Sequence, residues 1–69
     1  MEEFALNNRE YIELNNLLKV LGLCDTGGMA KAAIAEGLVK VNDSVELRKR
    51  CKLRKGDKIK FEGHEIIVT

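Results

Sequence analysis

The densest run of charge in the sequence covers residues 48–55, where six of eight residues are Lys or Arg and none is acidic. A guanidinium group is planar and can bind one phosphate through two hydrogen bonds, and an ammonium group adds a compact point charge. A charged run is often only a solvated surface, but this run contains no acid to neutralise it. We therefore predict that this segment binds phosphate groups.

Alternation along the segment divides its side chains between two faces if residues 45–53 are extended, because successive strand residues point to opposite sides. One face is mainly apolar and is expected to point to the core: Val45, Leu47, Cys51 and Leu53, with Lys49 as the exception. The other face is mainly cationic and is expected to point to solvent: Glu46, Arg48, Arg50, Lys52 and Arg54.

A second candidate anion site is residues 26–31, with the sequence TGGMAK. Free backbone N–H groups and the helix dipole favour an anion at the start of a helix. Gly27 and Gly28 carry no side chain that would block a phosphate, and Lys31 follows about one turn later. A tight turn between packed helices would explain the two glycines equally well. The segment is not a P-loop, which requires GxxxxGK followed by Ser or Thr.

Two helices are expected to position these candidates. The first repeats apolar residues at helical spacing: Leu14, Leu17, Leu18 and Leu21. It is expected to begin between residues 10 and 14 and to end at Gly22, a typical helix C-terminal glycine. The second is expected to be capped by Asp25 or Thr26 and to end at Gly37. Its apolar face repeats the same spacing: Ala30, Ala33, Ile34, Gly37 and Leu38.

After Gly37 the apolar residues recur with a period of two, which predicts strands. Strands are expected at residues 39–41, 45–53, 58–62 and 65–68, and a short one at residues 4–6. Turns are expected at residues 42–44 and 55–57, and a two-residue turn at Gly63-His64. The predicted fold class is α+β, with two packed, helix-turn-helix-like helices on a small, mainly antiparallel sheet.

Length and composition narrow the function. The 69 residues form one domain, 1–69, too small for a deep catalytic cavity. Net charge is only +1, but residues 31–60 hold ten basic and four acidic residues whereas residues 1–30 hold two and five. This asymmetry favours a polyanionic partner. There is no apolar run long enough to span a membrane and no signal-peptide pattern at the acidic N-terminus, so we expect a cytoplasmic protein.

The cysteine and histidine residues do not indicate a catalytic site or a metal site. Cys24 and Cys51 are far apart and form no CxxC pair, and His64 is the only histidine, so neither a metal site nor a catalytic triad is indicated. The cysteines are expected to be free thiols, and His64 is expected to be solvated in a turn. We predict a protein that is not an enzyme, with no cofactor and no small-molecule substrate.

Four segments together resemble the RNA-binding domain family named for ribosomal small-subunit protein four. They are TGGMAK at 26–31, EGLVKVN at 36–42, ELRKRCKL at 46–53 and GDKI at 56–59. The resemblance extends over residues 14–61 and is greatest to the family's short, stand-alone bacterial members. One departure is Asp43, where the family usually has glycine, and its charge lies near the expected patch.

The resemblance implies two helices on a small, bent sheet, and RNA binding at the start of the second helix and the neighbouring strand and loop. Residues that match the family's RNA-facing surface are Thr26, Lys31, Lys40, Arg48, Arg50 and Lys52. The charge pattern and the glycine pair add further candidates: Gly27, Gly28, Lys49, Arg54 and Lys55. Ribosomal RNA, transfer RNA and a small regulatory RNA all remain candidates, and the ribosome is a candidate partner.

The aromatic residues indicate which RNA is bound. Phe4, Tyr11 and Phe61 are the only ones, and no aromatic motif for stacking bases is present. We therefore expect recognition of phosphates and backbone shape in structured or double-stranded RNA. Two alternatives remain open. One is a DNA-binding helix-turn-helix, although the second helix is Ala-rich and offers few polar side chains to bases. The other is a protein-interaction module.

Overall fold

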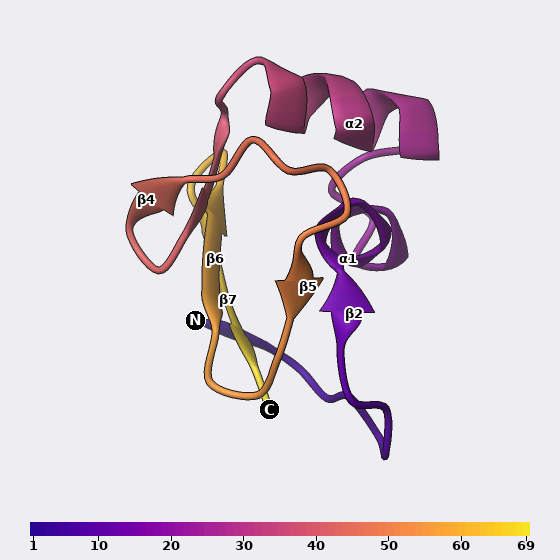
Figure 1. The fold of residues 1–69 in the computed structure, drawn as a ribbon, viewed down its shortest axis with the longest axis vertical. Coiled ribbons are helices and arrows are strands. Elements are labelled where there is room, and N and C mark those ends of the chain that lie inside the picture. Colours follow the sequence, from indigo (N-terminus) through magenta and orange to yellow (C-terminus); the bar gives the residue numbers. More distant parts are fainter.

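The computed structural model describes all residues from 1 to 69 and places two helices against one face of a sheet (Figure 1). The helices are α1 (Leu14–Val20) and α2 (Gly27–Ala35). The strands, in chain order, are β1 (Glu2–Phe4), β2 (Ile12–Glu13), β3 (Val39–Val41), β4 (Ser44–Val45), β5 (Lys52–Leu53), β6 (Lys58–Phe61) and β7 (His64–Val68). The predicted α+β class is confirmed.

The main sheet has the strand order β1-β7-β6-β3-β4. Every neighbouring pair is antiparallel except β1 and β7, which run parallel with Glu2 opposite Ile66. The sheet therefore brings the two ends of the chain together, and Thr69 N–H donates to the carbonyl of Phe4. A separate antiparallel ribbon joins β2 to β5, with Ile12 opposite Leu53. This ribbon carries part of the cationic run.

Both helices end where their glycines predict. Gly22 has a φ of +75°, its N–H donates to Lys19, and Leu23 N–H donates to Leu18, which is the bonding pattern that closes a helix at a left-handed glycine. Gly37 has a φ of +78° and ends α2. At the start of α2, the Thr26 hydroxyl accepts a hydrogen bond from Met29 N–H at 3.1 Å. The predicted Thr26 cap is therefore confirmed.

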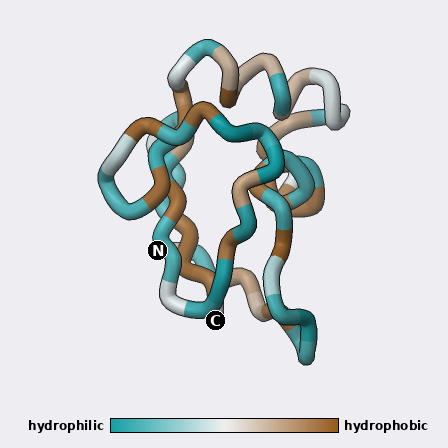
Figure 2. Tube along the Cα trace, in the orientation of Figure 1, coloured by the Kyte–Doolittle hydropathy of each residue, from teal (hydrophilic) through white to brown (hydrophobic).

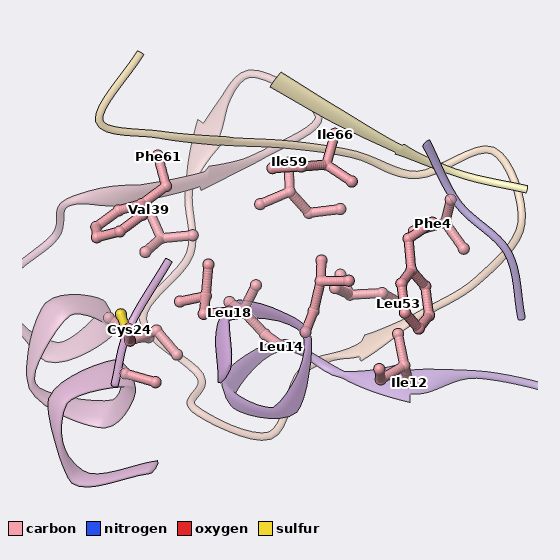
Figure 3. Packing of buried hydrophobic residues seen from close by; sticks show 14 of the residues in the cluster. Phe4, Ile12, Leu14, Leu18, Cys24, Val39, Leu53, Ile59, Phe61 and Ile66 are labelled. Carbon is pink, nitrogen blue, oxygen red and sulfur yellow. The ribbon is translucent and has the colours of Figure 1, made fainter. Parts of the chain in front are cut away.

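The core lies between the helices and the sheet (Figure 3). Sheet residues such as Ile59 and Ile66 point toward Leu14 and Leu18 of α1, and all four are fully buried. Ala30, Ala33 and Ile34 bury the face of α2 that the 3-4 spacing predicts. Leu38 is the exception: it is 53% exposed because the chain has already left the helix and Val39, the next residue, points into the core instead.

The structure also corrects several expected boundaries. The N-terminal strand is residues 2–4 rather than 4–6, and it is placed by its parallel pairing with β7. The last hairpin turns at Glu62-Gly63, not at Gly63-His64, because Phe61 and His64 face each other in the ladder. Both turn residues have positive φ, 49° and 81°. His64 is thus a strand residue, and its Nδ1 lies 2.8 Å from Glu2 Oε2.

The largest correction concerns residues 45–53, which were predicted to be extended throughout. Only β4 and β5 are strands, and the chain between them turns, with Cys51 N–H donating to the carbonyl of Arg48. Val45 and Leu47 are 51% and 61% exposed, so the predicted apolar face holds only for Leu53 and, in part, Cys51. The expected single row of outward cations is therefore broken into a loop followed by a short strand.

Candidate nucleic-acid interface

The connection between β4 and β5, residues 46–51, is fixed to the start of α1 by its main chain. The first two N–H groups of α1, from Leu14 and Asn15, donate to the carbonyls of Cys51 and Lys49 at 2.9 and 3.1 Å. Glu13, at the N-cap, makes no side-chain cap. The loop thus supplies the partners that a helix start requires. We call residues 46–51 the cationic loop, and Figure 2 shows a strongly hydrophilic stretch within it.

Within the cationic loop, Arg48 is held by Glu46. Arg48 Nε lies 2.8 Å from Glu46 Oε2, and Arg48 Nη2 lies 3.1 Å from Oε1, so the pair is two-pronged. Glu46 also accepts from the N–H of Arg48. The hydrogen bond from the Arg48 side chain lowers the pKa of Glu46 to about 2, and the same contact raises the pKa of Arg48. The Arg48 side chain remains 78% exposed, so it is not buried by this pair.

The β2–β5 ribbon carries the rest of the run on its outer face. Ile12 and Leu53 are paired and buried, so their neighbours on each strand point outward. On that outer face Lys52 Nζ lies 4.9 Å from the centroid of the Tyr11 ring, and Arg54 Cζ lies 5.6 Å from it. The outward direction predicted for Lys52 and Arg54 is confirmed.

An open hollow of about 390 Å³ joins the cationic loop to this ribbon. Its lining residues are Arg48, Arg50, Cys51 and Lys52. Arg50 lies 3.8 Å from Glu13, a loose contact that leaves its side chain 76% exposed. Three exposed cations therefore line one hollow, and anion binding there stays a prediction.

The start of α2 offers a second group of hydrogen-bond donors for an anion. Gly27 and Gly28 are the first two residues of the helix, and their N–H groups bond to no backbone carbonyl. Neither glycine has a positive φ. A Cβ at Gly27 would meet nothing within 4 Å, and one at Gly28 would meet only the Thr26 hydroxyl at 3.8 Å. Neither backbone conformation nor packing requires glycine here, which weakens the tight-turn explanation.

The remaining predicted residues fall in different places. Lys31 is exposed on α2, and Lys49 and Lys55 are exposed in turns. Lys40 points away from the helices, because Val39 and Val41 on either side of it face the core; it lines a hollow together with Lys60 on the outer side of the sheet. Figure 1 shows the cationic loop passing below α2, but no hydrogen bond or ion pair joins the loop to residues 26–31.

Sequence reasoning overlooked the parts that Tyr11 and Glu46 play in this surface. A single aromatic residue such as Tyr11 forms no base-stacking motif, and strand alternation predicts only that the Glu46 side chain points outward. Asn42 ties the β3–β4 hairpin to the next turn, because its amide donates to Asp57 and its carbonyl accepts from Lys58 N–H. Asp57 in turn accepts from Arg54 N–H. The one signal in the sequence for the Glu46–Arg48 ion pair is that the two residues are two positions apart.

Other chemical groups are inert or isolated. Cys24 and Cys51 are free thiols, and burial raises the pKa of each, which disfavours the reactive thiolate. No group of three or more His, Cys, Asp or Glu side chains could hold a metal ion. Neither helix has the length and apolar content needed to cross a bilayer. Lys60 is paired with Asp43 at 2.9 Å, and this hydrogen bond raises the pKa of Lys60 and lowers the pKa of Asp43.

The chain belongs to the S4 domain family, whose model matches residues 4–69. The resemblance drawn from the short sequence segments is therefore confirmed, and the match extends beyond residues 14–61.

Individual relatives agree with this membership. The chain is 47% identical to YbcJ of Escherichia coli strain K12 over 69 residues, covering all of this chain and 99% of that protein. It matches the solution structure of E. coli YbcJ with a TM-score of 0.76 and 46% identity, covering all of this chain and 87% of that one. That structure is described as revealing an ALFAL motif involved in RNA binding. A Bacillus subtilis protein, "Probable ribosome maturation protein RlbA", is 41% identical over 54 residues, 78% of this chain and 76% of its own.

Proposed function

We propose that this protein binds structured RNA through a surface made of the cationic loop, the outer face of the β2–β5 ribbon and the start of α2. The observation that carries the proposal is the set of exposed cations in residues 48–55. Four of them form no ion pair, because no acidic oxygen lies within 4 Å of their side-chain nitrogens: Lys49, Lys52, Arg54 and Lys55. Their charge is not neutralised by an ion pair within the protein, so it is available to a polyanion.

Family membership supports the choice of RNA as that polyanion, because the related YbcJ structure carries a motif involved in RNA binding. The name of the B. subtilis relative makes ribosomal RNA a candidate target. The molecule's longest dimension is 29 Å, so a single folded RNA could cover both the loop and the start of α2. No catalytic step is part of this proposal.

Phosphates and backbone shape supply most of the recognition in this proposal. The cations project from a loop and a short ribbon rather than from a helix that fits a groove. The exposed face of α2 has few long polar side chains beyond Lys31 and Glu36, which disfavours readout of base edges in DNA. If about five phosphates are neutralised, the logarithm of the affinity should fall with the logarithm of salt concentration at a slope of about −3.5 to −4.5.

The test measures binding of a hairpin RNA and of a DNA duplex of equal length across salt concentrations. Lys31→Ala, Arg48→Ala and Arg50→Ala should each weaken RNA binding and make the salt slope shallower by about one unit. Arg9→Gln removes the same charge from the turn at residues 7–10, at the end of the molecule opposite α2 in Figure 1, and is the matched control. Unchanged affinity in the triple variant, or preference for DNA, would overturn the proposal.

A protein-interaction module is the second candidate, and one observation favours it. Met29 and Leu38 are 52% and 53% exposed and line a mainly apolar hollow with Leu23. A protein partner at this hollow would stay bound at high salt and in the Arg48→Ala, Arg50→Ala variant. RNA binding at the cationic loop would be lost under both conditions.

A further inference from the structure

Tyr11 is the one aromatic side chain outside the core. Phe4 and Phe61 are 8% and 4% exposed, whereas Tyr11 is half-buried just before β2. The paired residues Ile12 and Leu53 face inward, so Tyr11 lies with Lys52 and Arg54 on the outer face of the ribbon. Its ring is therefore on the surface that carries the proposed phosphate contacts.

Two cations lie over one half-buried aromatic ring. Proteins that bind unpaired nucleotides combine an aromatic face, on which a base stacks, with cations that hold the neighbouring phosphates. An arginine guanidinium can also stack on a base, and it gains from the ring beside it. Here one ammonium and one guanidinium lie 4.9 and 5.6 Å from the centroid of one phenol ring.

Lys52 links this ring to the phosphate-binding hollow. It lines the hollow together with Arg48 and Arg50, and its ammonium also lies over the Tyr11 ring. A nucleotide whose phosphate sits in the hollow would therefore have its base within reach of the ring. Neither the Lys52 ammonium nor the Arg54 guanidinium has an acidic oxygen within 4 Å that would compete for that phosphate.

We propose that Tyr11, Lys52 and Arg54 form a stacking site for one unpaired nucleobase next to the phosphate-binding surface. The preferred ligand is then an RNA in which an unpaired base adjoins a duplex, such as a stem with a single bulged base. This inference rests on the proposed function and narrows it, because phosphate contacts alone would not distinguish a bulged stem from a fully paired one.

The experiment compares two RNA hairpins that share one stem, with and without a single bulged base, at one salt concentration. The wild-type protein should bind the bulged RNA about fivefold more tightly, the lower end of the range that stacking on an aromatic side chain gives. Tyr11→Ala should bind both RNAs equally. Tyr11→Phe keeps the ring and should keep the preference, and Lys52→Ala should weaken both RNAs.

Comparing two RNAs within each variant cancels any loss of folded protein in Tyr11→Ala. A direct readout is also available, because Tyr11 is the only tyrosine and the chain has no tryptophan. Isotope labelling of tyrosine gives one set of ring resonances, which should move upfield with the bulged RNA and stay in place with the paired RNA.

Equal binding of both RNAs by the wild-type protein, or a preference that survives Tyr11→Ala, would overturn the stacking site and leave the proposed function standing. Binding to neither RNA would overturn both. A Tyr11→Phe variant that loses the preference would also contradict the inference, since stacking does not need the hydroxyl group.

Discussion

Glu46 grips the guanidinium of Arg48 with both carboxylate oxygens, at 2.8 and 3.1 Å, and a third contact ties the Arg48 N–H to the same carboxylate. One of the arginines predicted to bind phosphate is thus already paired inside the free protein. The Glu46 side chain is only 15% exposed, whereas the Arg48 side chain faces solvent. Glu46 therefore shapes the cationic loop, and in the proposed function it competes with RNA for Arg48.

The first prediction concerns pH. The pKa of Glu46 is lowered in the folded protein from 4.5 to about 2, chiefly by the hydrogen bond from Arg48. A lowered folded-state pKa contributes stability that is fully present above the unfolded value and is lost as pH falls through the folded value. Thermal unfolding between pH 5 and about pH 2 should therefore show a steeper loss in the wild-type protein than in Glu46→Gln. Parallel curves would contradict this.

The second prediction concerns the competition between Glu46 and RNA. Glu46→Gln removes the carboxylate but keeps a similar shape, so it frees Arg48 and raises the net charge by one. RNA affinity at low salt should rise about two- to fivefold. In the wild-type protein RNA must break the Glu46–Arg48 ion pair, which contributes about 0.2–1 kcal/mol, and in the variant this cost is absent. A salt titration measures it. Weaker binding would mean that Glu46 acts mainly by ordering the loop.

The third prediction concerns the glycine pair at the start of α2. Gly27→Ala and Gly28→Ala should each stabilise the protein, by about 0.4–1 kcal/mol, because neither position needs a positive φ and both have room for a Cβ. RNA affinity should nevertheless fall about tenfold in the double variant, if the bare N–H groups bind a phosphate. Urea unfolding and RNA titration of the same samples separate the two effects.

Gly63→Ala is the matched contrast for that pair. Gly63 has a φ of +81°, so an added Cβ is strained there even though space is free. This variant should lose about 1 kcal/mol of stability and keep its RNA affinity. If Gly27→Ala and Gly28→Ala left RNA binding unchanged, the start of α2 would have no part in the interface.

The fourth prediction tests the core beneath the surface. Leu18 is fully buried between α1 and the sheet, so Leu18→Ala should lower the free energy of unfolding by about 2–5 kcal/mol. Val20→Ala on the same helix changes a side chain that is 63% exposed and should stay within about 0.5 kcal/mol. Urea denaturation measures both, and similar losses in the two variants would contradict the packing described.

The predictions from sequence were best where structure is local. The leucines at 14, 17 and 18 and the apolar residues of α2 recur at helical spacing, and Gly22, Thr26 and Gly37 mark helix ends through bonds to near neighbours. The fold class followed from these patterns. The parallel pairing of β1 with β7 could not be predicted in this way, because it joins segments more than 60 residues apart.

The candidate site was predicted in composition better than in geometry. The cations of residues 48–55 are exposed as expected, but alternation failed between Val45 and Cys51 because the Glu46 carboxylate bonds to the Arg48 N–H and the chain turns. Such a side chain–backbone bond leaves no periodic signal. Tyr11 is far from residues 52–54 in sequence and meets them only through the β2–β5 pairing. Whether Lys40 takes part stays a prediction.

The bonds from Leu14 and Asn15 to the carbonyls of Cys51 and Lys49 involve no side chain of the loop. Every residue, proline included, carries a main-chain carbonyl. This attachment therefore does not depend on which side chains occupy positions 49 and 51. Substitutions at these positions can therefore change the charge of the exposed loop while its main-chain bonds to α1 are kept. The displayed charge and the attachment of the loop to α1 are therefore separate properties of this segment.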